Sequence, residues 1–121
     1  MPDRNALTEW FHDLAGKSAE DLNHASSPAN LDKLRAHIAL SLPDCSPPDD
    51  LNDERFAEVV LQLRANEKAW NQATMAALIK ADDLFKNGHA SEARSELQAF
   101  AANCPWSLFK EVALDQAMNY V

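Results

Sequence analysis

Proline and glycine are unevenly distributed along this chain, and their positions limit the folds that it can adopt. The 121 residues include six prolines and only two glycines, and residues 53–87 contain neither. Because proline breaks helix interiors, the prolines divide the chain into separate helical segments. The scarcity of glycine argues against sandwiches, barrels and nucleotide-binding loops, which depend on glycine at tight turns. The pattern therefore favours a fold built from helices.

In the N-terminal part, apolar residues recur with the period of an α-helix. We expect helices over residues 6–15, over a short segment opened by Ser18, and over residues 28–42, where Asn30 is a candidate cap. Gly16 is expected to end the first of these helices. The apolar residues predicted to face inward are Leu7, Trp10, Phe11, Leu14, Leu31, Leu34, Ile38 and Leu42.

The C-terminal part continues the helical pattern. Residues 53–87 form either one long helix or two helices that meet near residues 66–71. Two further helices are expected, over residues 91–103 and 106–120. The residues predicted to face inward are Phe56, Val59, Val60, Leu63, Trp70, Ala77, Ala81, Leu84, Phe85, Ala93, Leu97, Phe100, Phe109, Val112, Ala113, Gln116 and Ala117.

No segment alternates apolar and polar residues as a β-strand does, so we expect an all-α fold, a compact bundle of about five to six helices. The length suits a single domain over residues 1–121. The proline-rich loop 43–52 then connects the N-terminal helices to the C-terminal helices. Trp10, Trp70 and Trp106 lie on or beside apolar stripes and are expected in the core.

Charge and cysteine content limit the partners and the compartment. The chain carries 19 acidic and 11 basic residues, a net charge of −8, which repels nucleic acid and favours a basic protein partner. Cys45 and Cys104 lack the spacing of metal ligands, which predicts free thiols in a reducing compartment. No apolar run reaches the about 18 residues of a membrane span, and residues 1–4 do not resemble a secretory signal. We therefore expect a cytoplasmic protein that does not bind membranes.

Two acid–histidine pairs, each spaced three residues apart on an expected helix, are candidates for metal binding. Di-metal sites in helical bundles combine two such pairs with two further glutamates. The residues concerned are Glu9, His12, Asp21, His24, Glu58 and Glu96. Two features count against such a site. The second pair starts with Asp21 where these sites use glutamate, and His12 lies beside the apolar stripe of its helix. With no phosphate-binding glycine loop or activated nucleophile, we expect no enzyme, no cofactor and no metal site, and a small metalloprotein is the alternative.

Residues 74–107 place small residues, a turn glycine and a closing proline in a recurring order. The residues that carry this pattern are Ala77, Ala81, Leu84, Gly88, Glu92, Ala93, Leu97 and Pro105. The stretch resembles a single tetratricopeptide repeat, although Lys80 and Phe100 depart from that pattern. A lone copy excludes a solenoid, which needs about three repeats. The resemblance implies a peptide-holding face lined by Met75, Leu78, Asp82, Phe85 and Lys86. The same face could instead pack against the N-terminal helices.

These features together predict a non-enzymatic protein–protein interaction module that binds through a helical face. An adaptor, a chaperone and a stoichiometric inhibitor of a toxin or nuclease all fit this description. For an inhibitor, an acidic segment would steer a basic target; it consists of Asp44, Asp49, Asp50, Asp53 and Glu54. Besides the metalloprotein, the alternative is a self-associating subunit that uses residues 53–87 as the seam of a homodimer.

Overall fold

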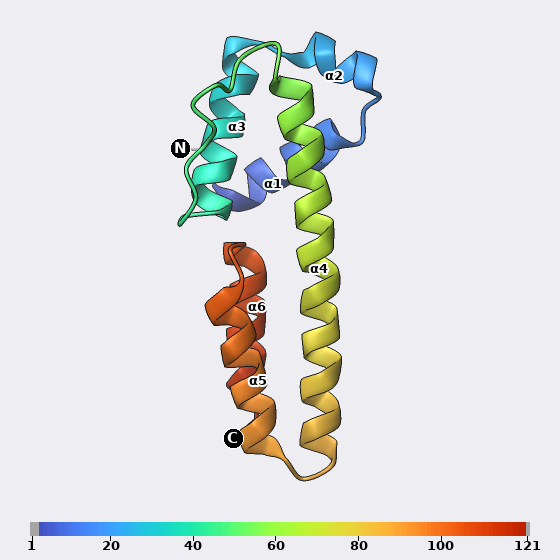
Figure 1. Cartoon of the computed structure of the whole chain (residues 1–121), viewed down its shortest axis with the longest axis vertical. Helices are drawn as coiled ribbons and strands as arrows, with labels where there is room; N and C mark the ends of the chain where they lie inside the picture. Colours follow the sequence, from blue (N-terminus) through green and yellow to red (C-terminus); the bar gives the residue numbers. More distant parts are fainter. Residues whose placement is uncertain (1–2, 121) are drawn as a thin grey trace. The chain divides into compact units, whose positions relative to one another are not determined.

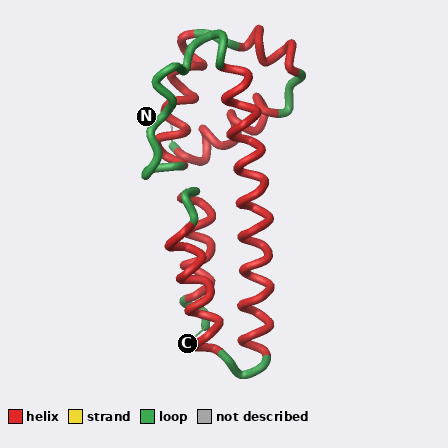
Figure 2. Tube along the Cα trace, viewed as in Figure 1, coloured by secondary structure: helices red, strands yellow, loops and turns green. Residues whose placement is uncertain are grey.

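The computed structural model describes residues 3–120, which fold into α-helices joined by loops (Figure 1). The helices within these residues are α1 (Arg4–Ala15), α2 (Ala19–Ala25), α3 (Pro28–Ser41), α4 (Phe56–Lys86), α5 (Ala90–Asn103) and α6 (Ser107–Ala117). No strand occurs within residues 3–120 (Figure 2). The all-α fold class predicted from the sequence is therefore confirmed.

The chain divides into two compact units, and the division falls inside α4. The first unit ends at Asn66 and holds α1, α2, α3 and the start of α4. The second unit begins at Glu67 and holds the rest of α4 together with α5 and α6. The proline-rich loop 43–52 lies within the first unit. A single domain over the whole chain stays a prediction.

Helix α4 is continuous over its 31 residues, which decides between the one-helix and two-helix alternatives. Residues 66–71 contain no proline or glycine that would break the helix. One turn further on, the hydroxyl of Thr74 donates a hydrogen bond to the carbonyl oxygen of Trp70 at 2.7 Å. The apolar face on each side of this region therefore belongs to a single helix.

The turn after α4 contains Gly88, the turn glycine that the sequence predicts. Gly88 has a φ of +85°, in the left-handed region. The backbone N–H groups of Gly88 and His89 donate to the carbonyl oxygens of Phe85 and Leu84 at 3.1 and 2.8 Å. These bonds satisfy carbonyl groups that the helix end would otherwise leave unpaired. The turn sends the chain back along α4 as α5 (Figure 1).

The first three helices begin at side-chain caps. The side chains of Asp3, Ser18 and Ser27 accept hydrogen bonds from backbone N–H groups three residues further on, at 2.7, 3.1 and 3.1 Å. The prediction that Asn30 caps α3 is wrong. Ser27 is the cap and Asn30 donates to it, because Pro28 fits the first helical turn, where its missing N–H has no partner to lose.

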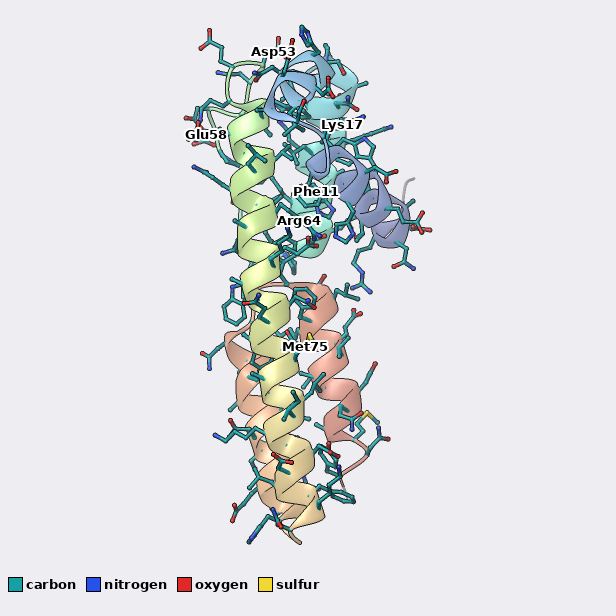
Figure 3. The ribbon with its side chains drawn as sticks, turned by 90° about the vertical axis from the view of Figure 1, so that its right-hand side faces the viewer. Phe11, Lys17, Asp53, Glu58, Arg64 and Met75 are labelled. Atoms are coloured by element: carbon teal, nitrogen blue, oxygen red, sulfur yellow. The ribbon has the colours of Figure 1, made fainter. Side chains whose placement is uncertain are left out.

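Large side chains fill the core of the first unit. The fully buried ones are Phe11, Leu22, Leu34, Phe56 and Val60. The ring of Phe11 (Figure 3) stacks on His37 of α3 at a centroid distance of 4.5 Å. His37 is itself buried, and its Nδ1 lies 3.3 Å from Ser41 Oγ. The apolar residues predicted to face inward from α3 are all buried: Leu31, Leu34, Ile38 and Leu42.

Small side chains dominate the core of the second unit. One buried cluster consists of Ala81, Ala93, Leu97, Ala101, Ala113, Ala117 and Tyr120, and Cys104 and Trp106 are buried as well. The prediction that Phe85 and Val112 face inward is wrong, since they are 42% and 39% exposed. The alanines occupy the positions between the helices, so the larger residues beside them lie further out.

The three tryptophans differ in exposure. Trp106 is buried, as predicted, whereas Trp10 and Trp70 are only half-buried, so the prediction is wrong for these two. The ammonium of Lys33 lies 5.9 Å from the ring centroid of Trp10. Trp70 meets Phe100 edge-on, also at 5.9 Å. Each half-buried ring therefore keeps one accessible side.

Candidate functional site: the groove between α4 and α6

A groove of about 590 Å³ runs between α4 and α6 in the second unit. Its lining residues come from both helices and from the turn after α6: Leu78, Ile79, Asp82, Val112, Asp115, Gln116, Asn119 and Tyr120. Figure 3 shows α6 beside the lower part of α4, with Met75 labelled on α4. The groove is therefore built from two segments that lie far apart in the sequence, with the whole of α5 between them.

Helical spacing explains why these side chains share one groove. On α6, Val112, Asp115 and Gln116 follow the i, i+3, i+4 pattern that marks a single helix face, and Asn119 continues this side in the turn after the helix. On α4, Leu78 and Asp82 are one turn apart, with Ile79 next to them. The buried alanines of α4 and α6 belong to one core cluster, and the larger residues beside them form the walls.

Apolar side chains give the groove an accessible hydrophobic surface. Ile79 is 62% exposed, and Val112 of α6 lines the same groove as a second exposed aliphatic residue. One turn earlier on each helix, Met75 and Leu108 extend the same faces and are also exposed. Adjacent exposed apolar residues of this kind are typical of surfaces that bind other molecules.

The polar residues of the groove are partly held by one another. Lys86 Nζ lies 2.7 Å from Asp82 Oδ2, and this hydrogen bond raises the pKa of Lys86. Asn119 donates to Gln116 Oε1 at 3.3 Å, and Gln116 donates to the hydroxyl of Tyr120 at 3.1 Å. The two carboxylates of the groove differ: Asp82 is paired with Lys86, whereas Asp115 has no ion-pair partner within residues 3–120.

The residues predicted for a peptide-holding face lie along one side of α4, where two of them line the groove. Leu78 and Asp82 line it, and Lys86 is bound to Asp82. Met75 is exposed one turn before Ile79 and does not line the groove, whereas Phe85 packs against Tyr120 at a ring distance of 4.9 Å. The prediction missed Ile79 and the whole α6 wall. The periodicity of α6 identified its faces, but it could not identify which neighbouring helix each face meets.

The predicted acidic segment belongs to the first unit, not to the unit that contains the groove. Arg55 forms ion pairs with Asp50 and with Glu58, and their hydrogen bonds raise the pKa of Arg55. Asp49 and Glu54 are exposed, as is Asp44. Asp53 Oδ1 accepts a hydrogen bond from the hydroxyl of Ser26 at 2.8 Å. Part of the charge expected to steer a basic target is therefore already paired within the chain.

The first unit contains a smaller groove of about 240 Å³ between the end of α3, the loop after it and the start of α4. Its aliphatic lining consists of Ile38, Leu42, Val59 and Leu63, and Cys45 and Arg55 also line it. The first three are buried and Leu63 is half-buried, so this groove presents less exposed aliphatic surface than the groove of the second unit, where Ile79 and Val112 are exposed.

The residues considered for chemistry are dispersed. Within residues 3–120, no group of three or more histidine, cysteine, aspartate or glutamate side chains could hold a metal ion. His12 and His24 are exposed on α1 and α2. Cys45 is an exposed free thiol, whereas Cys104 is buried. Burial raises the pKa of the Cys104 thiol, which lies 3.7 Å from the carbonyl oxygen of Trp106.

Comparison with known proteins found no matching family model, no matching curated protein and no matching solved structure. The resemblance of residues 74–107 to a tetratricopeptide repeat therefore stays a prediction. Over the described part of the chain, every helix is too short or too polar to cross a membrane.

Proposed function

We propose that this chain is a non-enzymatic protein–protein interaction module that binds another protein in the groove between α4 and α6. The observation that carries the proposal is the exposure of Ile79, 62%, beside Val112 in a groove with walls from two helices. A large exposed aliphatic side chain loses contact with water when a partner covers it, which stabilises the complex. Adaptor, chaperone and inhibitor roles all use such a surface.

The position of these apolar residues also supports the proposal. Single exposed apolar residues are common on any protein and need no explanation. Here Ile79 and Val112 line the same groove from two helices, and Met75 and Leu108 are exposed one turn before them on α4 and α6. Larger apolar patches of this kind are typical of binding sites. The polar side chains of Gln116 and Asn119, held by hydrogen bonds, can give the complex a defined orientation.

The test compares variants of exposed residues on the same helix. Ile79→Ser removes an apolar residue from the groove, and Leu61→Ser makes a similar change at a 46% exposed position of α4 in the first unit. We expect the wild type and Leu61→Ser to retain a stoichiometric protein from lysate of the native host, and Ile79→Ser to lose it. Val112→Ser should repeat the loss from the α6 side. Circular dichroism checks that all variants keep their helices.

Two results would count against the proposal. If all variants retain the same protein equally, the groove is not the binding site. If the wild type retains no stoichiometric protein, even at low salt, the chain is not an interaction module of this kind.

A further inference from the structure

We infer that the occupant of the groove is an amphipathic, basic helix of the partner protein, which places a lysine or arginine against Asp115. This inference rests on the proposed function and specifies the chemistry of the partner. Three features of the groove support it: the helical nature of both walls, the sign of its charges, and the consequence of pairing two copies of this chain.

The walls of the groove favour a helical occupant over an extended one. Both walls are α-helices, whose backbone N–H and C=O groups are bonded within the helices. An extended peptide would find no backbone partners there, whereas a helix satisfies its own backbone groups. From Val112 in α6 to Asn119 in the turn after it, this wall spans about 10 Å, or two helical turns. Apolar residues spaced i, i+3, i+4 and i+7 on the occupant would match this length.

The charges in the groove favour a basic occupant. Among the described residues, the lining includes the carboxylates of Asp82 and Asp115 and no lysine, arginine or histidine. Lys86 already engages Asp82, whereas Asp115 has no ion-pair partner within the described part of the chain. The net charge of −8 adds a long-range attraction for cations. A basic side chain beside Asp115 would therefore complement the groove and speed association.

The same charges disfavour a second copy of the chain as the occupant. A two-fold symmetric dimer uses the same surface on both copies. A dimer built on this groove would place Asp82 and Asp115 of both copies in one interface. Like charges in an interface repel each other, and the two chains also repel through their net charge. A basic partner protein avoids both effects.

The experiment uses the full chain and four synthetic helical peptides. Three peptides share one leucine face, spaced i, i+3, i+4 and i+7, and carry lysine, glutamine or glutamate on the polar face. The fourth has the lysine composition in scrambled order. Fluorescence anisotropy measures the affinity of each peptide, and amide chemical shifts locate the binding site. We expect the ordered lysine peptide to bind most tightly, to weaken as salt is added, and to shift the amide signals of Ile79 and Val112.

Three variants test the individual contacts. Asp115→Asn should weaken binding of the lysine peptide by about two- to fivefold, as expected for a partly exposed ion pair. The control Asp83→Asn removes an equal charge from α4 outside the groove and should change the affinity by less than about twofold. Ile79→Ser should weaken binding by about tenfold or more, because it removes an apolar contact.

The outcomes separate this inference from the proposed function. If the glutamate or glutamine peptide binds as tightly as the ordered lysine peptide, the basic occupant is wrong. If the scrambled lysine peptide binds as tightly as the ordered one, the binding is non-specific charge attraction and the helical occupant is wrong. A dimer in sedimentation experiments that Ile79→Ser dissociates would identify a second copy as the occupant. If no peptide binds but the host protein is still lost in Ile79→Ser, the helical occupant is wrong while the interaction module stands. Retention of the host protein by Ile79→Ser would contradict the module itself.

Discussion

The unit that ends at Asn66 encloses large side chains and no buried alanine among its described residues, whereas the unit that begins at Glu67 encloses five buried alanines beside a few larger side chains. In the first unit, phenylalanine, leucine and valine residues are fully buried, and Phe11 stacks on a buried histidine. Among the described residues of the second unit, five of the nine buried apolar residues are alanines, and the other four are Leu97, Cys104, Trp106 and Tyr120. The two units have similar numbers of residues and the same helical secondary structure, so side-chain size inside the helix contacts is the main difference between them.

On the outer surfaces the difference is reversed, because the second unit has more exposed large apolar residues than the first. Among residues 3–120, two exposed large apolar residues belong to the first unit, Leu40 and Leu61. Seven exposed large apolar residues among residues 3–120 belong to the second unit: Met75, Ile79, Phe85, Leu108, Val112, Leu114 and Met118. A core of alanines lets helices approach closely, but it leaves the larger apolar residues on outer faces. The second unit therefore carries the surface on which a partner gains most from burial.

The largest effect that this comparison predicts is in the first unit. Phe11→Ala should lower the free energy of unfolding by about 3–5 kcal/mol, because it removes a fully buried ring and leaves a cavity against His37. Urea unfolding followed by circular dichroism measures the change. The control Leu40→Ala removes an exposed apolar residue and should cost less than about 0.5 kcal/mol. A loss below about 1 kcal/mol for Phe11→Ala would mean that large side chains do not determine the stability of this unit.

In the second unit, we expect the stability to be most sensitive to a larger side chain at a buried alanine. Ala93 is fully buried between helices, so Ala93→Leu should destabilise the protein by about 1–3 kcal/mol through overpacking. Ala102→Leu, at an exposed position of the same helix, should change the stability by less than about 0.5 kcal/mol. The same unfolding measurement compares the two variants. Equal stabilities would show that the alanine contacts are loose and that close helix approach is not what positions the groove.

Much of the fold could be predicted because its signals are local. Proline and glycine positions, together with the caps at Ser18 and Gly88, set helix boundaries to within a few residues. The inward stripe of α3 was also predictable, since large apolar residues at helical spacing have one plausible place in a small unit. The cap at Ser27 was not predicted, because Asn30, three residues further on, is also a residue type that favours the cap position.

The candidate site was only half predictable. The pattern of residues 74–107 pointed to the α4 side, including Leu78 and Asp82. The α6 side depends on which helix neighbours α4, which hydrophobic periodicity does not state. Val112 illustrates the difficulty, because its spacing fits an inward stripe while Ala113 and Ala117 beside it take the buried positions. When small residues form the core, the largest apolar residue of a stripe is a poor guide to the interior.

The two glycines, one in each unit, give the smallest and most specific comparison. Gly88 has a φ of +85° and open space where a Cβ would lie, so Gly88→Ala should cost about 1–2 kcal/mol from backbone strain alone. Gly16 has a φ of −79°, and an added Cβ would meet its nearest atoms at ordinary contact distances of 3.5 and 3.6 Å. Gly16→Ala should therefore stabilise the protein by about 0.4–1 kcal/mol, because it restricts the unfolded chain.

Urea unfolding of both variants beside the wild type measures the two changes, and their opposite signs are the result to look for. The two substitutions add the same methyl group, and neither removes a side-chain contact, so they differ only in the backbone conformation that must accept it. Stabilisation by Gly88→Ala would mean that the turn after α4 is not held in the left-handed conformation. The hairpin of α4 and α5 would then lack a fixed turn, and the groove beside it would lose the support that keeps its α4 wall in place.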